Sequence, residues 1–149
     1  MGARNWPYLG IFVCLQATAG TLECPQADQA LIPIAHVRQH AQGLEMRRTR
    51  FAMCGQVTIR PGDLPDDPGA FYLQDATGGI SIVAVNPPRY SYGQWVLVKG
   101  KLHSLPSEEP EVQAQTATVV GPGRMPPPKR ASLGDVASGK LDGWHVSVE

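Results

Sequence analysis

Alternating apolar and polar positions along most of this chain predict short β-strands. From Phe51 to Ile59 the odd-numbered residues form an apolar face and the even-numbered residues a more polar one, which is the period-two pattern of a half-buried strand. Residues 94–102 alternate in the same way, and residues 111–121 supply a last strand. Gly55, in the middle of the first run, indicates a bulge or a sharp bend.

Two further apolar runs, within residues 69–83, flank a tight turn and predict a β-hairpin. The turn contains Asp75, Thr77, Gly78 and Gly79, and we expect its glycines to adopt the positive φ that a reversal needs. Asp75 is well placed to accept hydrogen bonds from amides of the turn. We therefore assign Asp75 a structural role rather than that of a catalytic acid.

Ahead of the first strand, residues 34–42 predict about two turns of helix, with Ile34, Val37 and Ala41 on one face. The chain thus has a small helix followed by five short strands. Five antiparallel strands avoid exposed edges by closing on themselves. We expect an all-β protein, a small five-stranded antiparallel Greek-key barrel with a short N-terminal helix.

The segment after the fifth strand contains a second helix-then-strand pattern. A Pro-rich linker at residues 122–131 leads to a helix-like piece, Ser132 to Ser138, and then to an alternating run at residues 142–149. This order echoes the helix and first strand of residues 34–59, so we expect residues 132–149 to begin a second, truncated unit. The alternative is that this segment docks on the barrel as an extra strand or stays loose.

The sequence pattern of the strands resembles that of the oligonucleotide/oligosaccharide-binding (OB) fold over residues 34–121. The matching motifs are Gly55-Gln56-Val57, Phe71-Tyr-Leu-Gln-Asp-Ala-Thr-Gly-Gly-Ile80 and Gly93-Gln-Trp-Val-Leu-Val-Lys-Gly100. The resemblance implies an OB-type barrel that binds its ligand on the face of strands two and three. Tandem units of this pattern also resemble extracytoplasmic modules found ahead of bacterial membrane sensor kinases.

Length and charge restrict the function further. The chain has 149 residues, room for one domain with short appendages, and its 13 basic residues balance 13 acidic ones. A net charge of zero provides no global field to attract a polyanion.

The N-terminus has the features of an export signal at residues 1–19. Arg4 precedes a short apolar stretch, and Ala17-Thr18-Ala19 offers the small residues of a cleavage site, with cleavage expected after Ala19. The stretch is too short to cross a membrane, so we expect no membrane span after cleavage. An extended arm at residues 20–33 follows. We expect a periplasmic or secreted protein, or a cytoplasmic one if the segment is an ordinary apolar tail.

The cysteines leave two readings open. If Cys14 departs with the signal, Cys24 and Cys54 remain, and an oxidising compartment would permit a disulfide between them. In the other reading Cys54 is a small buried apolar residue and Cys24 a free thiol, because sequence does not show whether their Cα atoms come within reach.

The residues do not point to catalysis. His36 and His40 have metal-binding helical spacing, but no third ligand accompanies them. No Ser-His-Asp order, nucleophile elbow or phosphate-binding glycine loop is present in the sequence. We expect a protein that is not an enzyme and has no metal site and no cofactor.

Our leading hypothesis is a secreted or periplasmic OB-fold binding module that holds a small ligand, a glycan or a partner protein on the face of strands two and three. In this hypothesis it serves as the binding part of an envelope sensor. The alternative is a domain that binds single-stranded nucleic acid. In this alternative aromatic side chains stack on the bases, and basic residues, Lys99 among them, line one edge of the groove. The candidate ligand-binding residues are Tyr72, Gln74, Ser81, Trp95, Arg48 and Arg50.

Overall fold

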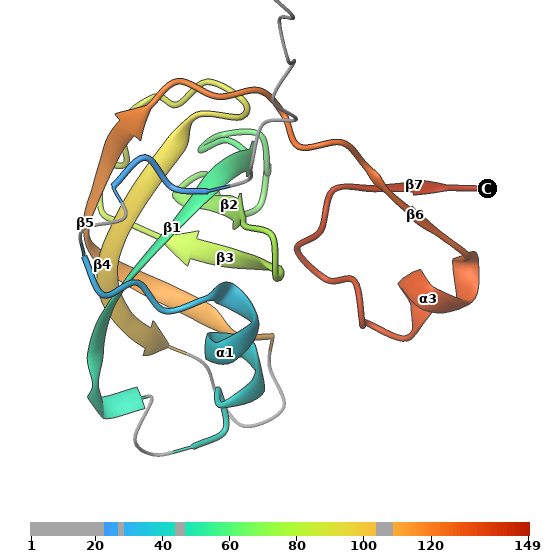
Figure 1. Ribbon diagram of the computed structural model, residues 1–149, viewed down its shortest axis with the longest axis horizontal. Coiled ribbons are helices and arrows are strands. Elements are labelled where there is room, and N and C mark those ends of the chain that lie inside the picture. The colour runs from blue at the N-terminus through green and yellow to red at the C-terminus, as the bar shows by residue number, and fades with distance from the viewer. Residues whose placement is uncertain (1–22, 27–28, 44–46, 104–108) are drawn as a thin grey trace, which may run out of the picture.

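The computed structural model describes residues 23–26, 29–43, 47–103 and 109–149 of the chain (Figure 1). The expected export signal at residues 1–19 lies outside the described residues, as does Cys14. In the described part of the chain, no helix combines the length and the apolar character that crossing a membrane requires.

Five strands close into a barrel in the order β1-β2-β3-β5-β4, which confirms the expected five-stranded barrel. Their bounds are β1 (Arg50–Ile59), β2 (Ala70–Gln74), β3 (Gly79–Val83), β4 (Trp95–His103) and β5 (Glu111–Gly121).

The sheet is mixed rather than wholly antiparallel as expected, because β3 and β5 run parallel. The other four pairs are antiparallel. The reason is topological: strand direction cannot alternate all the way around a closed ring that has an odd number of strands. A five-stranded closed barrel therefore contains at least one parallel pair.

Strand β1 serves two sides of the barrel. It pairs with β4 from Arg50 to Gln56 and with β2 from Gln56 to Ile59. The register shift lies between Val57 and Ile59, two residues beyond the bulge expected at Gly55. At Gly55 itself β2 comes so close that an added Cβ would lie 3.0 Å from the Cβ of Leu73.

The core fills the barrel and continues into helix α1 (Ile34–Gln39), which lies across one end of the barrel (Figure 1). Ile34 and Val37 on α1 are completely buried, as expected from their spacing. The helix ends three residues earlier than the expected residue 42. The barrel's side of this core consists of Phe51, Met53, Val57, Phe71, Leu73, Ile80, Ile82, Tyr90, Val96, Val98, Leu102 and Val112.

The N-terminus of α1 is capped by the β2–β3 turn rather than by its own sequence. Pro33, the N-cap residue, makes no side-chain cap. Instead the amide of Ile34 donates to Oδ2 of Asp75 at 2.9 Å, and the amide of Ala35 donates to Oγ1 of Thr77 at 3.0 Å. The carboxylate of Asp75 is thus shared between the turn and the helix.

The other oxygen of Asp75 holds the turn together, which confirms its expected structural role. Oδ1 of Asp75 accepts hydrogen bonds from the amides of Thr77 and Gly78, at 2.7 and 2.9 Å. The expectation of positive φ in this turn was wrong, since neither Gly78 nor Gly79 has one. The reason for glycine here is space: a Cβ on Gly78 would lie 3.2 Å from Cγ2 of Ile34.

Replacing Asp75 by alanine is expected to lower the free energy of unfolding by about 1–2 kcal/mol, the usual cost of removing an N-cap. Chemical denaturation of Asp75→Ala and of the control Asp66→Ala, an exposed loop carboxylate, measures the difference. Equal stability of the two variants would show that the carboxylate of Asp75 does not hold the helix.

Loops on the other end of the barrel meet through Asp63. Its carboxylate accepts hydrogen bonds from the guanidinium of Arg60, at 3.0 Å, and from the hydroxyl of Tyr92, at 2.7 Å. The guanidinium carbon also lies 4.2 Å from the centre of the Tyr92 ring. The hydrogen bonds from Arg60 and then Tyr92 hold the pKa of Asp63 well below its usual range.

Because this pKa is lowered in the folded state, the stabilisation from Asp63 is present above the unfolded pKa of about 3.9 and is lost as the pH falls through the folded pKa. In a carboxyl ¹³C NMR titration we expect Asp63 to titrate well below the ordinary aspartate pKa of about 3.9. Tyr92→Phe should raise the midpoint of Asp63. Titration of Asp63 near the ordinary aspartate pKa of about 3.9 in the unaltered protein would contradict the assignment.

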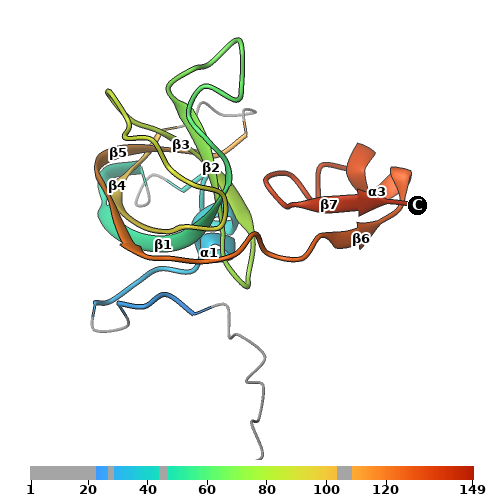
Figure 2. The ribbon, with the colours of Figure 1, turned by 90° about the horizontal axis from the view of Figure 1, so that it is seen from above.

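The tail, residues 122–149, forms a small unit of its own beside the barrel (Figure 2). It contains β6 (Lys129–Ala131), α3 (Leu133–Ala137) and β7 (Val146–Val148), and β6 pairs in parallel with β7.

Candidate ligand-binding surfaces

Three of the expected site residues come together on the outer face of β2 and β3. Tyr72 pairs with Ser81 across the two strands, and Gln74 pairs with Gly79. Yet Gln74 and Ser81 are only 3% and 8% exposed, and Tyr72 is partly buried. The face that the OB resemblance assigns to a ligand is therefore largely covered.

The cover is the tail of the same chain. The amide of His145 donates to Oε1 of Gln74 at 2.8 Å. Gly79 on β3 and Gly143 in the tail meet backbone to backbone, since a Cβ on Gly79 would overlap the carbonyl of Gly143. Two glycines at this crossing allow an approach that no larger residue permits.

A cleft of about 380 Å³ remains between this face and the tail. Tyr72 lines it from the barrel and Trp144 from the tail. Burial is the main cause of a raised pKa at the hydroxyl of Tyr72. The ring of Trp144 is also in contact with the chain itself, because the ammonium of Lys129 lies 4.6 Å from its centre.

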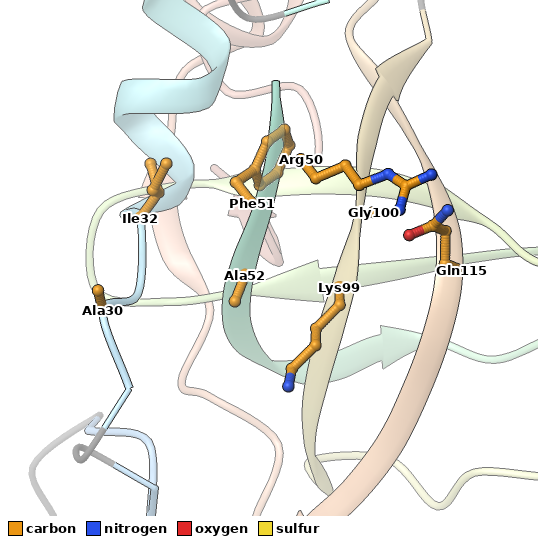
Figure 3. Close-up of a pocket in the computed structure, with 8 residues that line it drawn as sticks. All are labelled: Ala30, Ile32, Arg50, Phe51, Ala52, Lys99, Gly100 and Gln115. Carbon is orange, nitrogen blue, oxygen red and sulfur yellow. The ribbon is translucent and has the colours of Figure 1, made fainter. Parts of the chain in front are cut away.

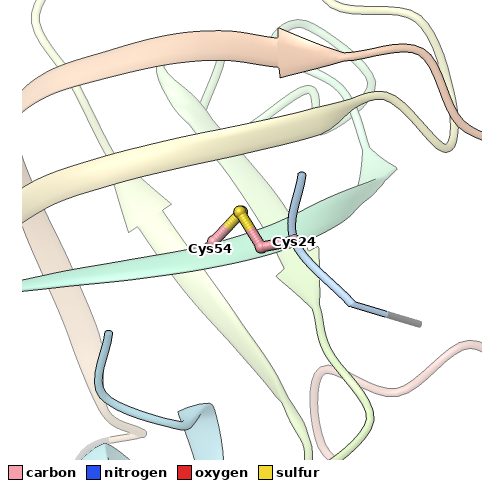
Figure 4. The surroundings of a disulfide bond; sticks show 2 residues. All are labelled: Cys24 and Cys54. Carbon is pink, nitrogen blue, oxygen red and sulfur yellow. A yellow bond between two sulfur atoms is a disulfide. The ribbon is translucent and has the colours of Figure 1, made fainter. Parts of the chain in front are cut away.

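Trp95 lies on a different outer face, apart from Tyr72. It is 6% exposed and packs with Cys54 and Leu97 beneath the arm. Cys24 and Cys54 form a disulfide with their Cα atoms 5.9 Å apart, so the arm is tied covalently to β1 (Figure 4). Of the two readings of the cysteines, the structure has the bonded one. Trp95 is therefore part of a small apolar cluster and not an open stacking surface.

The arm also walls a larger cavity, the arm pocket, of about 440 Å³ (Figure 3). Ile32 anchors this wall by donating its amide hydrogen to the carbonyl of Ala52 at 2.9 Å. The pocket is lined by Ala30, Ile32, Arg50, Phe51, Ala52, Lys99, Gly100 and Gln115. Among these described lining residues none is acidic.

Two cations belong to this pocket. Arg50 pairs with Lys101 and Ala52 pairs with Lys99, so Arg50 and Lys99 lie on one face of the sheet as diagonal neighbours. The side chain of Arg50 extends across Gly100 toward Gln115 on β5 (Figure 3). Arg48, the other expected basic residue, is exposed and does not line the pocket.

The sequence identified Arg50 as a candidate ligand-binding residue and placed Lys99 on a basic edge. It did not identify the other residues that line the arm pocket. Alternation places Lys99 on the outer face of its strand, whereas no local signal shows that β5 brings Gln115 beside Arg50. The arm was also missed as a wall, because its position depends on the disulfide and on the hydrogen bond of Ile32.

The two histidines of α1 and its C-terminal end interact with each other. Their rings stack with centres 4.1 Å apart, and Nδ1 of His40 lies 2.9 Å from the carbonyl oxygen of His36. Within the described ranges, no group of three or more metal-ligating side chains comes together.

Comparisons with known proteins add little to this geometry. No family model matches the sequence, and no curated protein matches it. Among solved structures, the chain matches a protein from Leishmania major Friedlin assigned as an aspartyl-tRNA synthetase, with a TM-score of 0.48 and 11% identity. The match covers 77% of this chain but 24% of that one, so the chain spans about a quarter of that protein.

The class of the protein follows from its own strand order. A closed five-stranded barrel in the order β1-β2-β3-β5-β4, with β2 and β3 joined as a hairpin, is an OB-type barrel.

Proposed function

We propose that this chain is a non-catalytic, exported OB-type binding module that holds a small anionic ligand in the arm pocket. The observation that carries the proposal is the pair Arg50 and Lys99 on one side of a cavity whose other lining residues include Ile32 and Phe51. A module of this kind would suit the ligand-binding part of an envelope sensor.

The chemistry of the pocket supports an anion with an apolar body. A guanidinium offers a planar fork of donors to a carboxylate, sulfonate or phosphate, and the side chains of Ile32 and Phe51 suit a hydrocarbon or aromatic ring. The volume lies within the usual range of about 300–1,000 Å³ for small-molecule sites. Since the whole chain carries no net charge, attraction of an anion depends on these local cations.

The position of the tail supports the arm pocket over the face of β2 and β3. A ligand on that face would compete with the hydrogen bond from His145 to Gln74 and with the Gly79–Gly143 contact. A ligand in the arm pocket displaces neither.

Naphthalene-1-sulfonate is a suitable probe, with uncharged 1-naphthol as its matched analogue. By isothermal titration calorimetry we expect the sulfonate to bind and Arg50→Gln to weaken it about 10-fold, the lower end for a charge-assisted hydrogen bond. Lys99→Gln should also weaken binding. Lys101→Gln, on the same strand and face but outside the pocket, should not.

Equal binding of sulfonate and naphthol, or equal loss in all three variants, would refute an anion site here. A short oligothymidylate tests the nucleic-acid alternative. If it binds more tightly than the sulfonate, weakens steeply with salt and is lost in Tyr72→Ala, the protein binds single strands and the proposed function is wrong.

The Cys24–Cys54 disulfide supports the export part of the proposal, because such bonds persist in oxidising compartments and are rare in the cytosol. The bond also matters for the pocket, since it holds the arm that forms one wall. Its two cysteines are 30 positions apart, and the chain-entropy estimate for a loop of that size is about 3.6 kcal/mol.

Expressed from its first residue with a C-terminal reporter, the protein should be processed near Ala19 and recovered from the periplasm or medium. Its Cys24 and Cys54 should resist maleimide until reduced. Cys24→Ser/Cys54→Ser should lose about 3.6 kcal/mol of unfolding free energy and bind naphthalene-1-sulfonate more weakly. An unprocessed cytoplasmic protein with reactive thiols would exclude export while leaving the anion test intact.

A further inference from the structure

The cleft between the barrel and the tail differs in chemistry from the arm pocket. Its volume is about 380 Å³, and its walls include two aromatic side chains, Tyr72 on β2 and Trp144 in the tail. Ile59 and Met125 add apolar surface. Among the described residues that line this cleft, none is a lysine, arginine, aspartate or glutamate, whereas the arm pocket contains two cations.

Hydrogen bonds hold the tail against the barrel on either side of this cleft. Nε2 of Gln56 donates to the carbonyl of Arg124 at 2.8 Å, and the amide of His145 donates to Gln74. The imidazole of His145 is also fixed, because its Nδ1 lies 2.9 Å from the carbonyl oxygen of Pro126. The loop between α3 and β7 thereby reaches the β2–β3 hairpin (Figure 1). The cleft is thus formed before a ligand arrives, which lowers the cost of binding.

Acidic side chains lie near the cleft on both the barrel and the tail. Tyr72 is paired with Ser81 on β3, and Ser81 is paired with Glu111 on β5. Residues that lie opposite each other on neighbouring strands share a face of the sheet, so Glu111 is on the face of Tyr72. In the tail, Asp142 directly precedes Gly143, which lines the cleft. Aromatic walls are therefore combined with a negative rim.

The charges of this rim act on the hydroxyl of Tyr72. Burial is the largest cause of its raised pKa. The negative charges of Glu109, Glu111 and Asp142 raise this pKa further. Arg38 offsets part of the charge of Glu109 through an ion pair at 3.3 Å. The local field at Tyr72 is negative although the whole chain has no net charge.

The chain itself places a cation on one of the aromatic walls. The ammonium of Lys129 lies 4.6 Å from the centre of the Trp144 ring, within the distance of about 6 Å that defines a cation–π contact. Lys129 is exposed, so its ammonium rests on the indole although water is available to it. This contact shows which sign of charge the indole of Trp144 attracts.

We propose that this cleft is a second binding site, separate from the arm pocket, for a small organic ammonium ion with a methylated nitrogen. Methyl groups on the nitrogen donate no hydrogen bonds, so such an ion is recognised by aromatic faces and by negative charge. Tyr72 and Trp144 supply the aromatic surface, and Glu111 and Asp142 supply the charge. The protein would then hold a cation and an anion on different sides of one barrel.

The first test compares choline with dimethylbutanol, the uncharged analogue in which a carbon atom replaces the nitrogen. By isothermal titration calorimetry with the whole chain, we expect choline to bind about 10-fold more tightly than the analogue. Tyr72→Leu should weaken choline binding about 5-fold, whereas Tyr72→Phe, which keeps the ring, should retain it. Equal binding of choline and its analogue, or equal loss in the two Tyr72 variants, overturns the proposal.

Two charge variants should change the affinity for choline in opposite directions. At low salt, Asp142→Asn should weaken binding and Lys129→Gln should strengthen it, each about 2-fold, as is usual for exposed charges. Asp66→Asn, which removes an exposed carboxylate of the β1–β2 loop, is the matched control and should have no effect. No change in either charge variant, or changes of the opposite sign, would show that the cleft does not select a cation.

A measurement on the unaltered protein does not depend on the folding of any variant. In ¹H–¹⁵N spectra, choline should shift the indole resonance of Trp144 and leave that of Trp95, beneath the arm, in place. Saturation with naphthalene-1-sulfonate should not change the affinity for choline. A shift of Trp95 in place of Trp144, or competition between the two ligands, refutes a separate site. Choline binding without sulfonate binding refutes the proposed anion site alone.

A methylated ammonium group also occurs on modified lysine side chains. A short peptide that contains one trimethyl-lysine therefore completes the titrations, with the unmodified peptide as its control. Tighter binding of the modified peptide than of choline identifies a protein side chain as the source of the group, and weaker binding identifies a free ammonium ion. Both results support the cleft as the site, whereas equal binding of the modified and unmodified peptides together with no binding of choline overturns it.

Discussion

The carboxylate of Asp75 is the interaction on which the arrangement of the barrel depends. One of its oxygens fixes the β2–β3 turn through Thr77 and Gly78, and the other receives the first amide of α1. The first amides of a helix have no partner within the helix, and leaving them unpaired where water is excluded is costly. Because Pro33 makes no side-chain cap, the first amides of α1 find their hydrogen-bond acceptors in the β2–β3 turn. This position places Ile34 and Val37 against the open end of the core.

Covering segments then distinguish the outer faces of the barrel. The described part of the arm, tied by Cys24 to Cys54, lies over β1 and β4, buries Trp95 and walls the arm pocket. The tail lies over β2 and β3, and its His145 amide donates a hydrogen bond to the side-chain oxygen of Gln74. An OB-type barrel ordinarily presents the face of strands two and three to its ligand. Here the tail of the same chain covers that face, and the cations of the arm pocket lie on a different side of the barrel.

The sequence was sufficient for those features that local pattern determines. Strand alternation identified the five strands and the core residues, and the chemistry of Asp75 identified its role in the turn. The helix cap could not be found in this way, because Asp75 and Ile34 are far apart in sequence and meet only after the barrel closes. Gly79 was misassigned for a related reason: a glycine in a turn suggests positive φ, whereas this one admits Gly143. That at least one strand pair runs parallel was available from topology alone, since five is odd.

The two helices illustrate how a cap determines the dependence of a segment on its surroundings. Helix α1 has six residues, too few to be stable in isolation, and its cap lies on another hairpin. It should therefore form only together with the barrel, so that its burial and its capping are gained or lost in one cooperative step. Helix α3, with five residues, is as short, but both partners of its capping box lie within its own first turn. Its local structure needs less support from the barrel, which is consistent with a tail that keeps its fold while Leu133 and Val136 remain exposed to solvent.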